Sequence, residues 1–385
     1  MVVCTLALHP GSPEFMPQLT VELLNSNDQV VAHRDRWNQL AGNRPLQRWE
    51  WLGAWAQHYC VGDSSLLVLV VRDADKIIAL APLCIMDRPY FGRTICFLGG
   101  GKACTDHMTF LVEPGFEDAA VETIANWLVE NRNGDSQWNH CQLIGVDADD
   151  AIMQKFNQAM TDVGCHLDTR PGQPCYGVDL PDTIEEYTSR RSKNGKRDTN
   201  KIKRQLNNGT CEIFTPTTRS ELEQYWDKFV ELHQMRRDML GEDGCFAHSK
   251  FGEFLWDASC RLLDAGLLRM PFVLIDGEPV SVQYSVVAED RWLFYQSGMN
   301  PGYQKNSPGQ VVLYHAICES IQSGHKYFDM MRGDEPYKLR WRAEMVSTTE
   351  IRIAAPQIYA QLKQRAWQWR KKAKAWAKER LGRPA

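Results

Sequence analysis

The 385-residue chain contains twelve cysteines but no C-x-x-C pair, and it has no H-E-x-x-H motif. These absences argue against a zinc ribbon, a thioredoxin-type site and a compact disulfide framework. No apolar run approaches the ~18 residues that a membrane-spanning helix needs. We therefore expect a cytoplasmic protein without a metal centre. Its scattered cysteines should be reduced and should act mostly as small buried apolar side chains.

The formal net charge is only −4, but basic residues are concentrated in two stretches. Residues 189–204 carry eight basic residues and one aspartate, and residues 363–383 carry nine basic residues and one glutamate. These stretches contribute +7 and +8, which leaves −19 for the rest of the chain. Such an acidic body argues against a general nucleic-acid binder, while each basic stretch could still bind anions locally.

Length and composition favour two packed domains. Hydrophobic residues make up 43% and aromatic residues 10% of the chain, enough to form ordinary cores. The N-terminal sequence MVVCTLALHPGSPEF has no basic residue before its apolar part and is a poor signal peptide. Its GSPEF segment resembles a cloning remnant, so we expect the native start at Met16 and treat residues 1–15 as a tail.

Each half of the chain predicts the same succession of helices, an antiparallel meander, a further helix and a further strand. In the first half these are a helix at 46–59, a hairpin at 64–86, a strand at 94–101, a helix at 119–132 and a strand at 138–146. In the second half they are helices at 228–240 and 251–266, three strands within 267–299, a helix opening at Ser307 and ending at Gly324, and a strand at 326–333. We therefore predict an α/β (α+β) protein of two similar modules.

The segment NSPGQVVLYHA begins a helix with no acidic residue nearby. Pro308 at the first helical position and Gln310 three residues after Ser307 predict a capping box, which needs no ligand. Gly309 is unfavourable in a first turn, and its missing side chain would let an anion approach the free N–H groups. With Lys305 alongside, the alternative is a site for phosphate or pyrophosphate.

The C-terminal stretch combines a strong positive charge with one apolar stripe. The stripe has helical 4,3,4,3 spacing and consists of Leu362, Ala366, Trp369, Ala373 and Trp376. This helix is expected either to dock on the body through the stripe or to lie against anionic lipid.

Residues 295–341 resemble the GNAT-superfamily acetyltransferases associated with bacterial cellulose biosynthesis, the CelD/BcsL type. The likeness rests on the Ser-Pro-Gly helix start and on a strand of the form F-D-x-x-R-G-x-x-x-Y-K. The matching residues are Phe328, Asp329, Arg332, Gly333, Tyr337 and Lys338. The first half and the basic segment at 187–204 are also similar to that family, so the likeness spans roughly residues 37–353.

The resemblance implies two tandem GNAT-like modules, each a mixed, largely antiparallel sheet flanked by helices, and acyl transfer from acetyl-CoA or another acyl-CoA. It divides the chain into an N-terminal module at 16–180, a basic helical connector at 181–215, an acyl-CoA-binding module at 216–358 and a basic helix at 359–385. Cofactor contacts are then expected from Lys305, Ser307, Pro308, Gly309, Gln310 and Lys338. No metal is implied.

In this fold the thioester lies where the strands RWLFYQSGM and KYFDMMRG separate. An amine nucleophile must lose a proton, and a thiolate must gain one. Asp329, Asp334 and Glu335 are the candidate bases and Tyr337 is the candidate acid, although each could equally be structural. Lys338 and Arg332 should hold a phosphate or an internal carboxylate. Asp106, His107 and Arg332 are candidates for acceptor binding.

Three functions follow as hypotheses. The first is acyl transfer to a small-molecule or glycan-linked acceptor in exopolysaccharide or cell-envelope metabolism, with the C-terminal helix touching a membrane or a synthase complex. The second is a FemAB-like aminoacyl transferase, in which the basic connector would hold tRNA. The third is a non-catalytic scaffold of a polysaccharide-synthesis assembly.

The basic stripe around Arg190 and Arg191 would reach CoA phosphates or an anionic acceptor, or would be a solvated helix face.

Overall fold

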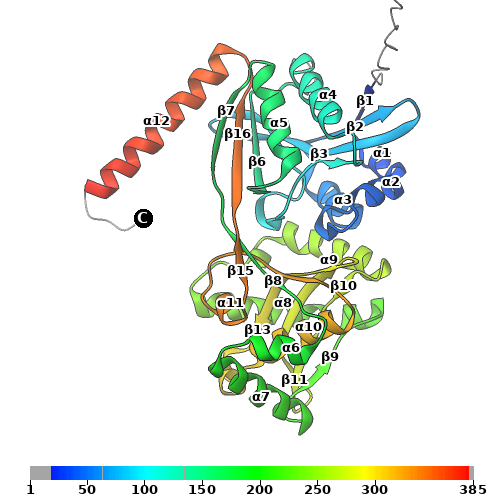
Figure 1. Ribbon diagram of the computed structural model, residues 1–385, viewed down its shortest axis with the longest axis vertical. Coiled ribbons are helices and arrows are strands. Elements are labelled where there is room, and N and C mark those ends of the chain that lie inside the picture. The colour runs from blue at the N-terminus through cyan, green and yellow to red at the C-terminus, as the bar shows by residue number, and fades with distance from the viewer. Residues whose placement is uncertain (1–18, 63, 134–135, 381–385) are drawn as a thin grey trace, which may run out of the picture.

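Two large mixed sheets lie one above the other along the long axis of the molecule (Figure 1). The computed structural model describes residues 19–62, 64–133 and 136–380. The predicted fold class is confirmed, because each sheet contains one parallel strand pair among antiparallel ones and is flanked by helices.

The first sheet has the order β1 (Leu19–Leu24), β2 (Ser65–Asp73), β3 (Lys76–Arg88), β4 (Gly92–Phe97), β6 (His140–Asp147), β16 (Thr348–Ala354) and β7 (His166–Pro171), with β5 (Leu111–Val112) on β3. Its helical segments are α1 (Asn27–Ala32), α2 (Arg34–Ala41), η1 (Pro45–Gln47), α3 (Trp49–Tyr59), η2 (Gly101–Ala103), α4 (Glu117–Glu130) and α5 (Ala151–Asp162). The predicted helix at 46–59 and the hairpin at 64–86 are both found here.

The second sheet has the order β15 (Glu344–Val346), β8 (Cys175–Asp179), β14 (Tyr327–Arg332), β13 (Arg291–Met299), β12 (Glu278–Val287), β11 (Phe272–Ile275) and β9 (Glu212–Phe214), with β10 (Leu268–Arg269) on β12. Its helical segments are α6 (Ile184–Arg190), α7 (Lys193–Asn207), α8 (Arg219–Leu240), η4 (Cys245–Ala247), α9 (Ser249–Asp264), η5 (Pro301–Asn306), α10 (Pro308–Gln322) and α11 (Tyr337–Arg340). A last helix, α12 (Ile358–Arg380), follows β16.

The chain crosses between the sheets twice, so the sheets do not follow the predicted module limits. Strand β8 lies within 16–180 but pairs in the second sheet, and β16 lies within 216–358 but pairs in the first. The two connections touch where Gly172 N–H donates to the Thr348 carbonyl at 2.9 Å. Strand pairing between distant segments leaves no local pattern in the sequence, which is why the limits were misplaced.

The basic segment at 181–215 also lies elsewhere than predicted. Helices α6 and α7 do not sit between the sheets but pack with α10 in the second unit (Figure 1). Tyr187 and Ile202 are buried there in the same core as α10. The segment is therefore an integral part of the second unit.

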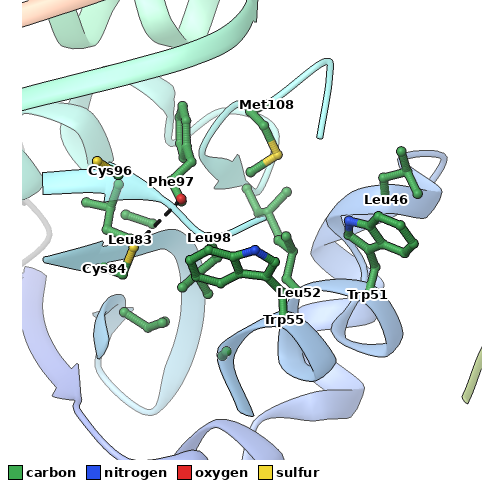
Figure 2. Close-up of a cluster of buried hydrophobic side chains, with 14 of the residues drawn as sticks. Leu46, Trp51, Leu52, Trp55, Leu83, Cys84, Cys96, Phe97, Leu98 and Met108 are labelled. Atoms are coloured by element: carbon green, nitrogen blue, oxygen red, sulfur yellow. Dashed lines mark hydrogen bonds between the residues drawn. The ribbon is translucent and has the colours of Figure 1, made fainter. Parts of the chain in front are cut away.

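The tryptophans of α3 join the first core to the glycine-rich loop that follows β4. Trp51, Leu52 and Trp55 pack with residues of β3 and β4 (Figure 2). Trp51 Nε1 donates to Thr105 Oγ1 at 2.9 Å, and Trp55 Nε1 donates to the Gly100 carbonyl at 3.2 Å. These bonds hold the loop that carries Asp106 and His107 against α3.

Helix α12 extends away from the body (Figure 1), and its predicted apolar stripe does not dock on it. Leu362 is 58% exposed and Trp369 is 76% exposed. The helix is anchored through its opposite side instead, where Ala360 and Gln364 are buried and Trp367 stacks between the guanidinium groups of Arg170 and Arg352. No helix of the described residues is long and apolar enough to cross a membrane.

Helix α8 approaches β13 so closely at Gly298 that we expect Gly298→Ala to destabilise the fold. A Cβ atom there would lie 2.4 Å from His233 N, a backbone atom that cannot rotate away. The loss should be ~1–3 kcal/mol in chemical denaturation. Gly309→Ala is the matched control, because its Cβ would meet only Met299 Sδ at 3.6 Å. That control should unfold like the original protein or later, and equal stability of both variants would contradict the constraint.

Candidate active site

The two central strands of the second sheet separate at the predicted place. Strands β13 and β14 pair in parallel only from Arg291–Tyr327 to Leu293–Asp329. Beyond that point β13 continues on β12 past a register shift, and β14 reaches β8 again at Arg332. Asp329 therefore lies where the strands begin to part.

A buried histidine links Asp329 to the first sheet. His107 Nε2 lies 2.9 Å from Asp329 Oδ2, off the line of a good hydrogen bond, so the contact is chiefly an ion pair. On its other side, His107 Nδ1 lies 2.8 Å from Asp147 Oδ1 at the end of β6. Asp329 is fully buried, whereas the Asp147 side chain is 26% exposed. The three side chains form a chain from the strand separation to solvent.

The charge of this histidine follows from its neighbours. Burial alone would lower the pKa of His107, but the charge of the Asp329 carboxylate and the hydrogen bond to Asp147 raise that pKa well above its ordinary value. The Cys175 thiol lies beside the ring, and burial raises its pKa to about 11. The thiol is therefore neutral at physiological pH, which argues against a thiolate nucleophile at this position.

A small cavity of about 20 Å³ is lined by Asp329, His107, Asp106 and Leu293. A volume of that size holds about one water molecule. The Gln47 side chain closes one side by donating to the His107 carbonyl. Asp329 can therefore exchange a proton through a water molecule, but it has no room to touch a large acceptor directly.

Asp106 and Arg332, both candidates for acceptor binding, are bound to each other. Arg332 Nε donates to Asp106 Oδ1 at 2.7 Å, and the backbone N–H of Arg332 donates to Oδ2 at 3.2 Å. Asp106 is 3% exposed. Both residues nevertheless line a cleft of about 490 Å³ between the sheets, with Gly145, Gln173 and Thr348.

Lys338 takes the second of its two predicted roles, because it contacts an internal carboxylate and not a phosphate. Its ammonium group donates to the carbonyls of Met331, Arg332 and Gly333 at 3.0, 2.8 and 3.0 Å. The side chain is 1% exposed and also pairs with Glu335 at 3.0 Å. With all three donors used, Lys338 shapes the turn after β14 and is not available to a phosphate.

Of the three remaining catalytic candidates, two are exposed at the surface and one, Tyr337, lies near the strand separation. Asp334 and Glu335 are exposed in the loop after β14. Tyr337 is half-buried beside Arg236, a residue that also donates to Ser297 Oγ on the diverging part of β13. Burial raises the pKa of Tyr337 to about 12, so its phenol stays protonated and can give a proton to a thiolate.

The start of α10 lacks the capping box that the sequence predicts. Ser307 adopts a left-handed conformation with φ 54°, and its side chain does not cap the helix but points back to the Gln304 carbonyl. Backbone bonds to the Ser307 carbonyl occupy the N–H groups of Gln310 and Val311. Ser307 supplies no side-chain cap, and the N–H of Gly309 lies in the first turn, where an α-helix offers it no intrahelical acceptor.

The basic helix α7 lies beside this helix start. Lys201 Nζ donates to the Lys305 carbonyl at 3.1 Å, and Gln205 Nε2 donates to the Asn306 carbonyl at 3.0 Å. Lys305 is itself exposed. Arg191, by contrast, is 4% exposed and stacks on Trp341 with its guanidinium 3.8 Å from the ring centre, while exposed Arg190 pairs with Glu186. The exposed basic residues of α7 and Lys305 can therefore meet an anion, whereas the guanidinium of Arg191 is buried.

Sequence reasoning missed Asp147, Arg236 and Gln47. Asp147 ends a strand just before a helix, and such a position often carries a functional carboxylate. That signal was present in the segment IGVDADD. Arg236 and Gln47 reach the site only through the packing of α8 and η1, so no local pattern marked them.

Residues 189–339 match the family described as "Acetyltransferase (GNAT) domain". That part of the chain is therefore similar to GNAT-type acetyltransferase domains, and it contains the strand separation, the start of α10 and Asp329. No curated protein matches the chain.

Several solved structures share the whole architecture. FemX is 10% identical, with 89% of this chain and 99% of FemX covered at a TM-score of 0.62. A tandem GNAT protein from the clavulanic acid biosynthesis pathway is 12% identical, covering 88% and 99% at a TM-score of 0.50. L-PGS from Bacillus licheniformis is 10% identical, covering 86% and 92% at a TM-score of 0.51. At such identities the likeness shows the fold alone.

The raised pKa of His107 makes stability depend on pH. Its folded-state pKa lies above the unfolded value of ~6.5, so its contribution is complete below that pH and is lost as pH rises through the folded-state value. We expect the original protein to lose more thermal stability than His107→Gln between about pH 6 and 9. The midpoint temperature of thermal unfolding, recorded across this pH range for each protein, measures the loss. Exposed His248→Gln should keep the original profile, and parallel curves for all three proteins would refute the assignment.

Proposed function

We propose that the chain is a CoA-dependent acyltransferase that transfers an acetyl or other acyl group to an amine, or to a hydroxyl, of a small-molecule or glycan-linked acceptor. The observation that carries the proposal is the position of Asp329 at the separation of β13 and β14, in the same domain as an uncapped helix start. The resemblance to the CelD/BcsL type suggests an acceptor from exopolysaccharide or cell-envelope metabolism.

The start of α10 would bind the pyrophosphate of the thioester carrier. The positive end of the helix dipole and the N–H of Gly309 favour an anion there. The exposed basic residues of α7, among them Lys201, stand next to η5 and can add attraction. Neither packing nor backbone conformation of the protein itself requires a glycine at 309, since a Cβ would make an ordinary contact.

Proton transfer would follow the chain of buried side chains. As the amine attacks the thioester carbonyl and the new C–N bond forms, its proton passes to Asp329 through the water-sized cavity. His107 and Asp147 lead that proton towards solvent. When the C–S bond breaks, the thiolate takes a proton from Tyr337, which solvent then restores.

The role of the α10 start in binding pyrophosphate is tested by measuring the affinity for acetyl-CoA in titration calorimetry. Gly309→Asp places a carboxylate against the phosphates, and we expect at least a tenfold loss of affinity, which is about 1.4 kcal/mol. Gly309→Ala should bind more weakly than the original protein but more tightly than Gly309→Asp. Unchanged affinity in Gly309→Asp would remove the Ser-Pro-Gly turn from the mechanism.

The FemAB-like reading remains as a second candidate, favoured by the basic outer face of α7 and by the shared fold with FemX. It predicts tRNA binding that falls steeply with salt and is weakened by Lys196→Gln with Arg197→Gln. Acetyl-CoA binding without tRNA binding supports the first proposal. Binding of neither ligand would favour the scaffold.

The proton path is tested with asparagine variants of Asp329 and Asp147, and Asp149, which lies close to Asp147 in sequence, serves as the control. Asp329→Asn should lower kcat by about 10²–10⁴-fold, the usual effect of losing a general base. Asp147→Asn should lower kcat less, leave KM unchanged and shift the pH profile of kcat. The base Asp329 remains in this variant, but the proton can no longer pass from His107 to a carboxylate at position 147. Exposed Asp149→Asn is the matched control. Equal pH profiles for Asp147→Asn and Asp149→Asn would exclude the path.

A further inference from the structure

We propose that the exposed face of α12 binds the surface of a membrane that contains anionic lipid. The inference concerns a surface outside the acyltransferase site and does not depend on the reaction. It rests on the way this helix is anchored, on the side chains that it leaves in solvent and on its charge.

The anchored side and the apolar side of α12 are opposite each other. Ala360, Gln364 and Trp367 follow one another at helical spacing, and they form the side that contacts β16 and β7. Leu362 and Trp369 lie half a turn away, since each residue advances by ~100° around the helix. Anchoring therefore presents the apolar stripe outwards rather than burying it.

The exposed stripe is long and contains large side chains. Ile358 is 78%, Leu362 58%, Trp369 76% and Trp376 57% exposed. Ala366 and Ala373 lie between them and are exposed as well. Isolated exposed apolar residues need no explanation, but a continuous stripe with tryptophans is typical of a binding surface. Tryptophan in particular favours the boundary between lipid headgroups and acyl chains.

Basic residues border this stripe on both sides. Helical geometry places Lys363 and Arg370 along one edge and Arg365 along the other, and all three side chains are solvent-accessible. Residues 358–380 hold eight basic residues and one acidic residue in total, a net charge of +7. Long cationic side chains beside an apolar stripe can reach phosphate headgroups while their stems cover acyl chains.

The positive charge of α12 favours an anionic membrane, rather than a second copy of this chain, as the partner that covers the stripe. Two α12 helices packed through their stripes would bring two sets of like charges together, which is unfavourable. An anionic bilayer satisfies both the stripe and its basic borders. The helix would lie in the plane of the interface, since no helix of the described residues can span a bilayer.

The test is co-sedimentation of the full-length protein with vesicles of phosphatidylglycerol and phosphatidylcholine, compared with phosphatidylcholine alone. We expect binding to the anionic vesicles, at least about tenfold weaker binding to the neutral ones, and release by high salt. Tryptophan emission should shift to the blue on binding, because Trp369 would leave water.

Two pairs of variants assign the binding to α12. Leu362→Ser with Trp369→Ser should reduce vesicle affinity at least about tenfold, because both substitutions remove side chains that would be buried. Val31→Ser with Val61→Ser removes two exposed apolar residues elsewhere and should bind like the original protein. Arg365→Gln with Arg370→Gln should also weaken binding at least about tenfold, and the charge-matched control Arg34→Gln with Lys250→Gln should not.

All these substitutions are on the surface, so the folded state can be verified by circular dichroism. Absence of binding, equal binding to both vesicle types, or binding unchanged by both α12 variants would each overturn the proposal. Dimerisation that Leu362→Ser with Trp369→Ser abolishes, without vesicle binding, would overturn it too. In that case a second copy covers the stripe.

Discussion

Two consecutive residues of one loop join the halves of this protein through buried charge. Asp106 binds Arg332, and His107 stands between Asp329 and Asp147. Both partners in the second sheet belong to β14, so the loop fixes this strand from two sides. Removing one member of such a buried pair costs ~3–5 kcal/mol, because the other charge is left without a counter-ion. The position of the candidate base therefore depends on the first sheet as much as on its own.

The crossed connections serve the same arrangement. Strand β8 carries Cys175 beside His107, and β16 continues the first sheet next to β6, which ends at Asp147. The backbone of the turn after β14 is held by Lys338 through three carbonyls. Each half of the chain thus adds one strand to the sheet of the other half. The cleft of about 490 Å³ between the sheets is bounded by residues of both. Ligand sites often lie at such interfaces between two units.

Particular segments show how far sequence reasoning reached. The helix at 46–59, the hairpin around Asp73, and the strand that carries Asp329 were predicted from local patterns of apolar residues, and the structure contains all three. The helix start at Pro308 was also predicted, but its capping box was wrong, because the left-handed Ser307 turns its hydroxyl away. The cofactor contact of Lys338 was expected from the resemblance alone, and no local pattern indicated its buried carbonyl partners.

The sequence by itself determined the types of element, a helix that starts at Pro308 with a glycine in its first turn, a strand that carries an aspartate, and a basic helix with one apolar stripe. These features depend on residues close together in the chain, where hydrophobic period and turn chemistry act. Only the tertiary structure decided that β8 and β16 pair in the sheet of the other half, that Asp147 contacts His107 beside Asp329, and that α12 turns its stripe outwards. These features depend on pairing and charge neutralisation between segments far apart, and no local pattern encodes such partners.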